Sequence, residues 1–491
     1  MLKEINEVIK LAKETKTDVY VVGGYLRDFL LKKKSLDIDL AVSEKSENFA
    51  KKLAKKINGK CFKLHDDLQT YRVAVFNNPE LEYIDVSVMQ GKNIKEDLSR
   101  RDFTINALAV KIEDFDDIKK NITDYFGGLK DLKKKEIKAV SKTVFNDDPL
   151  RMLRAFRFAS EYRFKISKET LTLIKKSSSK VTTVAGERIK NELFRILSNE
   201  KSAQYIAMID ECGLLEKMFP VITKMKKSAK NFYYHPKGLF QHCFQTYEAL
   251  ENIFIKLDKY FPNSKDILEK HLNEPFSENV SKKNLLKFIA IFHDCAKPEC
   301  AKRMDNKMRF LGHEELGAKK TAQIMKELKM SNKEIDFAKA IISEHMRPSN
   351  LAKSEVITNR AQMRLFRDIK ENTPDLLIMA MSDWHSYKTL KKKVYPKKVL
   401  QQQEKSVAKL IFSYFDFINK KPKDKILDGN VLMKEFHLKP GKIIGELLKY
   451  INNAYEEGRI KDKKQALKYA KSQLTVLKKI IQSLRIKLTR I

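Results

Sequence analysis

Hydrophobic and polar positions follow two different periods along this chain. Before about residue 140, four stretches rich in β-branched and aromatic residues indicate strands: Asp18–Val22, Leu36–Val42, Tyr71–Phe76 and Tyr83–Met89. The segments between them, such as Ser46–Ile57, have helical periodicity. Beyond residue 140 the helical period continues to the end, interrupted by prolines. The pattern predicts an α+β protein with a mixed α/β head followed by an elongated, all-α arm.

Length and composition set the class of the protein. A chain of 491 residues is too long for one core, so two to four domains are expected, and 42% hydrophobic residues are enough to build them. The five cysteines form no CxxC pair, the first residues read as a charged amphipathic helix, and no run of eighteen apolar residues occurs. We therefore expect a cytoplasmic protein without a membrane span.

The charge balance points to a polyanionic partner. The chain has 99 Lys and Arg against 64 Asp and Glu, which gives a net charge of +35. A protein this basic usually binds nucleic acid. The alternative, that the lysines only solvate helix surfaces, stays open because charge alone does not specify a partner.

The densest chemical signal is a glycine turn followed by two carboxylates. Val21-Val22-Gly23-Gly24-Tyr25-Leu26-Arg27-Asp28 reads as strand, turn and helix, and Asp37-Ile38-Asp39 follows on the next strand. The glycines let backbone N–H groups approach phosphate oxygens at a helix start, and Arg27 can add a charged contact to a triphosphate. Strand alternation puts Asp37 and Asp39 on one face, where they can hold two Mg²⁺ ions. This layout predicts nucleotidyl transfer.

Three later motifs make the resemblance specific. They are Ser99-Arg100-Arg101-Asp102-Phe103-Thr104-Ile105-Asn106, then Asp124-Tyr125-Phe126-Gly127-Gly128-Leu129-Lys130-Asp131-Leu132, then Asp147-Asp148-Pro149-Leu150-Arg151-Met152-Leu153-Arg154-Ala155-Phe156-Arg157-Phe158. With the glycine turn and the carboxylates, the chain resembles the tRNA nucleotidyltransferase and bacterial poly(A) polymerase family, in its bacterial and eukaryotic class. The resemblance implies that Gly24, Arg27 and Arg101 hold the triphosphate and ribose.

Asp148 and Arg151 are candidates for choosing the base. Pro149 suits the first position of a helix, so Asp148 is expected to cap it, with Arg151 one turn further on. They could simply be a cap and a surface cation. The resemblance implies instead that Arg151 donates to the Watson–Crick acceptors of C or A while Asp148 accepts from the exocyclic amine. It also assigns Arg154 and Arg157 to the nucleotide.

Two further features of the head bear on the reaction. Asp85 shares a strand face with Tyr83 and could be a third carboxylate near the metals or a structural acid. The stretch Val86–Leu98 is short where family members that complete CCA carry a long arginine-rich loop, so it resembles the CC-adding branch.

The arm carries an ordered set of histidines and aspartates. His293 and Asp294 close an apolar helix, and a buried His-Asp pair needs partners such as a metal. The series H…HD…H…H…D resembles the HD phosphohydrolase superfamily, with the usual HD-x-G-K written here as His293-Asp294-Cys295-Ala296-Lys297. A single histidine could equally be a core residue. We expect an unidentified divalent metal held by His242, His293, Asp294 and Asp383, with His313 and His345 serving a second metal or the substrate phosphate.

These expectations combine into one hypothesis. Residues 1–140 form the catalytic head, 141–205 a helical neck that selects the base, 206–400 an HD domain and 401–491 a tRNA-binding tail. The protein is expected to add C residues (CC-adding), or C residues followed by A (CCA-adding), to a tRNA 3′ end from CTP and ATP, with Mg²⁺ and without a nucleic-acid template. The alternatives are a poly(A) polymerase of the same family, or an HD phosphohydrolase with an inert RNA-binding head. The sequence leaves the oligomeric state open.

Overall fold

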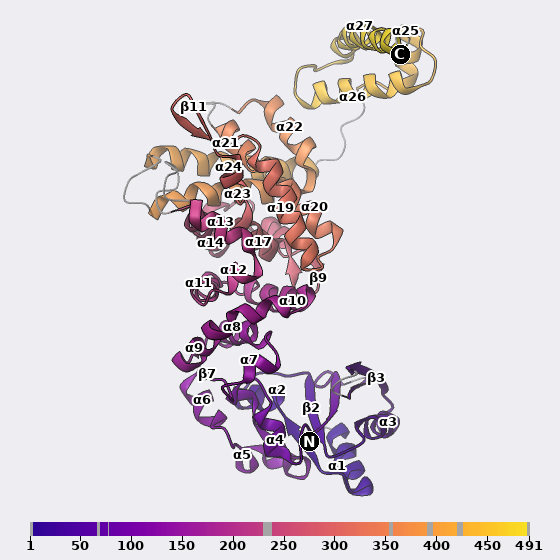
Figure 1. Ribbon diagram of the computed structural model, residues 1–491. Coiled ribbons are helices and arrows are strands. Elements are labelled where there is room, and N and C mark those ends of the chain that lie inside the picture. Colours follow the sequence, from indigo (N-terminus) through magenta and orange to yellow (C-terminus); the bar gives the residue numbers. More distant parts are fainter. Residues whose placement is uncertain are drawn as a thin grey trace. The chain divides into compact units, whose positions relative to one another are not determined.

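The protein divides into two compact units. The computed structural model describes residues 3–65, 69–76, 78–228, 238–352, 357–389, 396–419 and 426–488. One unit comprises Met1–Thr223 with Glu327–Lys329, and the other Lys224–Lys326 with Met330–Ile491. Figure 1 shows the mixed sheet at the N-terminal end and helices through the rest. The expected architecture, an α/β head followed by helices, is confirmed, whereas the four-part division at 140, 205 and 400 stays a prediction.

A six-stranded sheet forms the centre of the head, in the order β3-β4-β5-β2-β1-β6. Its neighbours pair antiparallel except β2 and β5, which run parallel. The strands are β1 (Val19–Val22), β2 (Asp37–Val42), β3 (Lys60–His65), β4 (Thr70–Ala74), β5 (Tyr83–Val88) and β6 (Ala109–Lys111). The four strands expected from the sequence are present, and the edge strands β3 and β6 are additional.

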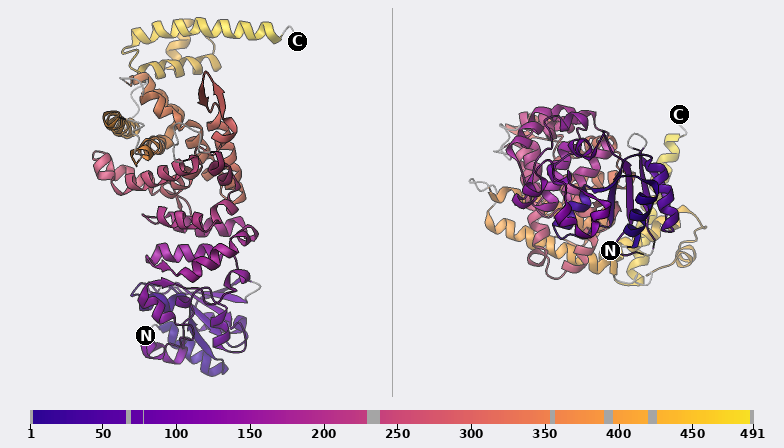
Figure 2. Two further views of the ribbon diagram at one scale, coloured as in Figure 1. Left: turned by 60° about the vertical axis from the view of Figure 1, so that its left-hand side comes forward. Right: turned by 90° about the horizontal axis from the view of Figure 1, so that it is seen from below.

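The two faces of this sheet have different environments. Ile38, Val73 and Ile84 are fully buried on one face, where α3 (Ser46–Lys56) packs on β4 and β5, and α1 (Lys3–Thr15) packs on α3 (Figure 2). Alternation turns Asp37 and Asp39 to the opposite face. One face of the sheet therefore packs into the hydrophobic core, and the polar side chains of the other face can contact a ligand.

Helices complete the first unit. They are α2 (Gly24–Leu30), α4 (Ile94–Ser99), α5 (Ile118–Asn121), α6 (Gly128–Lys134), α7 (Val144–Asp147), α8 (Arg151–Tyr162), α9 (Lys168–Ser177), α10 (Gly186–Leu197), α11 (Ala203–Glu211) and α12 (Leu214–Met218). A short parallel pair, β7 (Glu136–Ile137) and β8 (Lys165–Ile166), links the head to this helical region. Helix α8 packs against α10 and α11, which places its motif residues on a fixed support.

The second unit is built around a group of packed helices. α14 (Leu239–Ile255), α17 (Lys282–Phe292), α20 (Asn332–Glu344), α23 (Thr373–Ser386) and α24 (Lys397–Asn419) contact one another. Around them lie α15 (Leu257–Tyr260), α16 (Lys265–Leu272), α18 (Lys297–Cys300), α19 (His313–Glu327), α21 (Met346–Ala352) and α22 (Asn359–Ile369). α13 (Pro220–Ser228) crosses the boundary between the units.

The C-terminal helices have a core of their own. α25 (Gly429–Phe436), α26 (Lys442–Glu456) and α27 (Lys463–Leu488) bury Leu432, Leu447 and Ile451 completely. Two small hairpins, β9 (Pro275–Ser277) with β10 (Val280–Ser281) and β11 (Lys302–Met304) with β12 (Lys307–Arg309), interrupt the helical unit, where the sequence indicated only helices. Among the helices of the described residues, none combines the length and the apolar composition that crossing a membrane requires.

Candidate functional site

Strand register brings three carboxylates together on the open face of the sheet. Asp39 on β2 pairs with Asp85 on β5, and Asp37 lies two residues earlier on the same face as Asp39. Burial and the neighbouring carboxylate Asp85 raise the pKa of both Asp37 and Asp39, while Arg72 and Arg101 oppose the rise. A site in which carboxylates repel one another fits a bound divalent cation such as Mg²⁺.

The glycine turn lies directly over Asp39. Gly23 has φ +73°, and a Cβ there would stand 2.7 Å from Nη1 of Arg101 and 3.3 Å from Oδ2 of Asp39. Any side chain at this position would therefore be strained and would also displace the arginine. The backbone N–H of Gly24 donates a hydrogen bond to Asp39. The turn, the carboxylate and Arg101 are thus packed as one unit, as the sequence motif suggested.

A chain of polar contacts ties the glycine helix to the next motif. Nη1 of Arg27 donates to Oδ1 of Asn106 at 2.6 Å, and Nδ2 of Asn106 donates to Oδ1 of Asp102 at 2.9 Å. The other nitrogens of Arg27 bind Asp28 at 3.0 and 2.8 Å, and its guanidinium lies over the rings of Phe158 and Tyr162. Arg27 is therefore largely committed to protein groups, and its predicted contact with triphosphate stays a prediction.

Arg154 continues this chain onto α8. Its Nε and Nη2 donate to Oδ2 of Asp102 at 2.8 and 2.7 Å. Burial alone would raise the pKa of Asp102, but Arg154, Asn106 and the N–H of Phe103 lower it to about 2. Asp102 is therefore a buried junction that is ionised at neutral pH and holds α8 against the open face of the sheet.

The two residues expected to choose the base lie at the start of α8. The helix begins at Arg151, two residues later than the Pro149 start that the sequence suggested. Oδ1 of Asp148 accepts from the N–H of Leu150 at 3.1 Å, so the aspartate still orders this turn. Nη2 of Arg151 donates to the carbonyl oxygen of Arg100 at 2.8 Å, which fixes the direction of the guanidinium.

Arg188 is a residue that the sequence gave no reason to select. Its Nη2 donates to Oδ2 of Asp148 at 2.8 Å, from the first turn of α10. Arg157 takes an inward position: its side chain is 4% exposed and binds Glu192 at 2.6 Å and Glu161 at 2.8 Å. Its predicted role in nucleotide contact is untested, and its position behind Arg154 suits support of the neighbouring arginine.

One cleft of about 570 Å³ joins these groups within the first unit. Its lining is basic and polar, and it includes residues of the glycine turn and α2, of β2, of the Arg101–Asn106 motif and of the turn into α8 with α8 itself: Gly23, Gly24, Arg27, Asp39, Arg101, Asp102, Asn106, Asp148, Arg151, Arg154 and Arg157. That volume suits a ligand of nucleotide size. The arrangement can hold a polyphosphate at the glycine turn while its base lies near Asp148 and Arg151.

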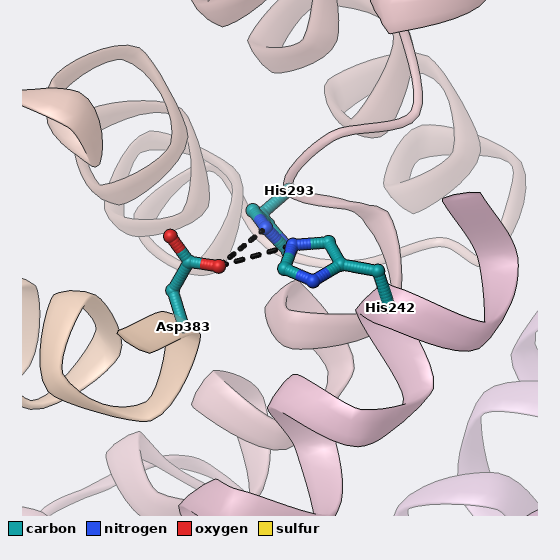
Figure 3. Close-up of side chains that lie close together, drawn as sticks. All are labelled: His242, His293 and Asp383. Carbon is teal, nitrogen blue, oxygen red and sulfur yellow. Dashed lines mark ion pairs between the residues drawn. The ribbon is translucent and has the colours of Figure 1, made fainter. Parts of the chain in front are cut away.

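The second unit has a separate cluster of imidazoles and carboxylates. Oδ1 of Asp383 lies 3.0 Å from Nε2 of His242 and 3.9 Å from Nε2 of His293 (Figure 3). Asp294 lies between two groups, with Oδ2 3.3 Å from His293 and Oδ1 3.4 Å from both His313 and His345. The structure thus brings all six predicted residues together from separate helices and their ends.

Hydrogen bonds at the far side of the rings fix how these histidines face the centre. Nδ1 of His293, His313 and His345 donates to the carbonyl oxygen three residues earlier, at 2.9, 2.6 and 2.7 Å. Their Nε2 atoms then carry the lone pair and point at the carboxylates. Among the described residues, the buried Nε2 atoms of His293 and His313 and Oδ1 of Asp383 have no hydrogen-bond partner.

The ligand set fits a divalent metal. His242, His293 and Asp383 present atoms within 4.8 Å of one another, and so do Asp294, His313 and His345. Burial alone would raise the pKa of Asp294, but Lys297, His293 and His242 hold it well below its usual range. Imidazole nitrogens with carboxylate oxygens suit first-row transition metals. Lys297, whose Nζ lies 2.6 Å from Oδ2 of Asp294, is a further member of the site.

Three family models match successive parts of the chain. Residues 19–138 match the Poly A polymerase head domain, 163–226 match "Probable RNA and SrmB- binding site of polymerase A", and 310–470 match tRNA nucleotidyltransferase domain 2. The match to the head domain contains the glycine turn and the carboxylates. The assignment of an HD domain to the second unit stays a prediction.

Similar proteins extend over part or all of the chain. A CC-adding tRNA nucleotidyltransferase of Geobacter sulfurreducens is 37% identical over 43% of this chain, which spans about half (48%) of that relative. An A-adding tRNA nucleotidyltransferase of Deinococcus radiodurans is 26% identical over 90% of this chain and 92% of its own length. The fold is that of the Thermotoga maritima CCA-adding enzyme solved with tRNA, at TM-score 0.64 and 22% identity over 96% and 94% of the two chains.

The matched segments occur in one order, and the motif residues meet in one cleft over the carboxylate strands. In its head and in two later segments this chain therefore matches the family models of poly(A) polymerases and tRNA nucleotidyltransferases.

Proposed function

We propose that the protein is a template-independent nucleotidyltransferase that adds C residues, with or without a final A, to the 3′ end of tRNA. The observation that carries this proposal is the common cleft, in which Asp39, the glycine turn and Asp148 with Arg151 line one volume. Relatives named as CC-adding, A-adding and CCA-adding enzymes support the reaction class and leave the end point of addition to experiment.

The chemistry follows from what these groups hold. The RNA 3′-oxygen attacks the α-phosphorus of CTP in line, a new P–O bond forms, and the bond to pyrophosphate breaks. Mg²⁺ held by Asp37 and Asp39 would lower the pKa of the attacking hydroxyl and neutralise the leaving group. Gly24 and Arg101 orient the triphosphate, so that the α-phosphorus faces the carboxylate strand.

Base choice is assigned to the start of α8. The guanidinium of Arg151, directed by the carbonyl of Arg100, can donate to the acceptor edge of C or A, and Asp148 can accept from the exocyclic amine. Guanine and uracil carry an N–H where the arginine donates, so they are disfavoured. Arg188 competes for the same Asp148 oxygen and sets its direction when no base is bound.

The test uses tRNA lacking its 3′ end and each labelled nucleoside triphosphate. Addition of two cytidines and a stop supports the CC-adding branch that the short Val86–Leu98 segment indicated. Completion to CCA supports the full enzyme, and a long A tail identifies a poly(A) polymerase and contradicts the proposal. Asp37→Ala and Asp39→Ala should abolish extension, because each removes a metal-binding carboxylate.

The six-residue cluster supports a second activity, metal-dependent hydrolysis of a phosphate ester. A divalent metal on the imidazoles and carboxylates would supply an activated water, and Lys297 lies beside the shared Asp294 to hold a phosphate oxygen. Hydrolysis of phosphomonoester and phosphodiester probes with added Mn²⁺ tests this. Asp294→Asn should abolish hydrolysis while RNA extension continues, and hydrolysis that survives this change contradicts the assignment.

A further inference from the structure

The open face of the sheet continues well past the catalytic carboxylates. Register places Asp39, Asp85, Arg72 and Phe62 in one row across β2, β5, β4 and β3. Directly paired residues project to the same side of a sheet, so all four side chains lie on the catalytic face. Neighbouring strands are about 4.8 Å apart, so the row runs roughly 14 Å from Asp39 to Phe62.

Beyond Arg72 this face exposes two phenylalanine side chains, Phe62 in the row and Phe76 near it, whereas the opposite face is buried. Phe62 is 44% exposed and Phe76, just after β4, is 50% exposed. On the other face of the same strands Val73 is fully buried and Tyr71 is nearly so. Two exposed phenylalanines on one face of a sheet are unusual for a surface that contacts only solvent.

In the middle of the row, Arg72 binds Asp85 and also lies over the ring of Tyr83. Nε and Nη2 of Arg72 donate to the two carboxylate oxygens of Asp85, each at 2.7 Å. The same guanidinium lies 4.5 Å from the centroid of the Tyr83 ring. This bidentate pair occupies both carboxylate oxygens of Asp85, so the third carboxylate considered from the sequence also fixes the orientation of the Arg72 guanidinium. The plane of a fixed guanidinium, like an aromatic ring, is a surface on which a base can stack.

We propose that this face, made of Phe62, Arg72, Phe76 and Tyr83, is a platform for the unpaired 3′-terminal nucleotides of the RNA acceptor. The inference rests on the proposed nucleotidyl transfer, because that reaction puts the acceptor 3′-hydroxyl at Asp37 and Asp39. The nucleotides before the 3′-terminal one must then lie along the surface next to these carboxylates. The row offers stacking groups within two or three nucleotides of the carboxylates, and exposed Lys60 adds a positive charge for the backbone.

Stacking on this platform is independent of base identity, which suits the chemistry. Every base has a flat π-face, so the same groups can hold the acceptor strand before and after each addition. The base-reading groups on α8 face the incoming nucleotide instead. The platform therefore aligns the acceptor strand, while Asp148 and Arg151 select the nucleotide that is added.

The test measures acceptor binding with Phe62→Ala and Phe76→Ala, separately and together. Both side chains are exposed, so the variants should fold, and circular dichroism checks this. The matched control is Phe29→Ala, which removes a phenylalanine that is 38% exposed on α2. The double variant should raise KM for an RNA minihelix with a single-stranded 3′ overhang about tenfold, since stacking contributes on that order per base. KM for CTP should not change, and Phe62→Trp should restore KM for the RNA.

A direct contact assay separates this inference from the proposed function. The same minihelix, carrying 5-iodouridine in its overhang, is irradiated with the protein and the cross-linked peptide is identified. We expect the cross-link at Phe62, Phe76 or Tyr83, in Asp39→Asn as well as in the unchanged protein. A cross-link confined to other segments, an unchanged KM in the double variant, or equal competition by a blunt minihelix would overturn the platform. Failure of the protein to extend any RNA would overturn nucleotidyl transfer, while the cross-link still decides whether the face binds a strand.

Discussion

Replacing Arg154 by methionine tests the buried junction between the catalytic face and α8. Asp102 is 6% exposed, and its contacts with Arg154, Asn106 and the N–H of Phe103 outweigh burial and lower its pKa from 3.8 to about 2. A shift of that size corresponds to about 2 kcal/mol of stability. Because the folded pKa is depressed, this contribution is complete above about pH 5 and is lost as the pH falls from about 4 towards 2.

In Arg154→Met the cost of burial dominates, so the pKa of Asp102 should rise above its ordinary value. We expect the first unit to lose about 3 kcal/mol at pH 7, because one partner of a buried ion pair has been removed. The loss should shrink as the pH falls to 4, since the variant's Asp102 then takes up a proton.

Urea unfolding at pH 7, 5 and 4 measures both effects. Circular dichroism follows the whole chain, and the only tryptophan of the sequence, Trp384, reports the second unit by fluorescence. Arg188→Met is the matched control, because its pair with Asp148 is half-exposed and should contribute less than about 1 kcal/mol. An equal loss at pH 7 and pH 4, or a loss as large in the control, would refute the reasoning.

Three other predictions concern the nucleotide, the RNA and the metal. Asp148→Ala should relax base choice and raise incorporation of U relative to C about tenfold, measured by competition between labelled triphosphates; unchanged selectivity would remove the aspartate from base reading. RNA affinity should fall steeply with salt, because a chain of net charge +35 displaces counterions, and a flat log–log plot in a filter-binding titration would contradict an extended phosphate contact. His345→Ala should lower the Mn²⁺ bound per chain, measured by elemental analysis, since it removes one ligand of the set with Asp294 and His313; an unchanged Mn²⁺ content would exclude that ligand assignment.

Much of the catalytic head could be predicted from local pattern. The glycine turn, Asp37 and Asp39 could be placed because alternation and turn chemistry act over a few residues. Strand β3 was not foreseen, since its KCFKLH sequence mixes lysine with apolar residues and it lies at the sheet edge. Whether such a segment forms a strand depends on pairing with residues far away in the chain, and a single sequence does not show that pairing.

The hydrogen-bond and ion-pair partners of the site residues were the least predictable feature of the site. Arg72 on Asp85 depends on strand register, and Arg188 on Asp148 depends on how α10 packs against α8. The start of α8 at Arg151 also differs from the expected Pro149, because the backbone N–H of Leu150 donates to the side chain of Asp148 before the helix begins. In the second unit the order of histidines and aspartates pointed to six residues that the structure brings together, and their role as metal ligands stays a prediction.

The sharing of Asp294 between two sets of imidazoles has a consequence for how the protein matures in the cell. His242 leaves the ribosome long before Asp383, so the centre stays incomplete until most of the second unit has been synthesised. On the proposed metal-binding role, ion uptake would be coupled to a late folding step, because ligands so far apart in sequence form no site in the unfolded chain. The identity of the ion would then depend on which divalent metal the cell has available at that moment as well as on the affinity of the finished site. Under the same proposal, protein produced in media of different metal content would carry different ions on the same six side chains.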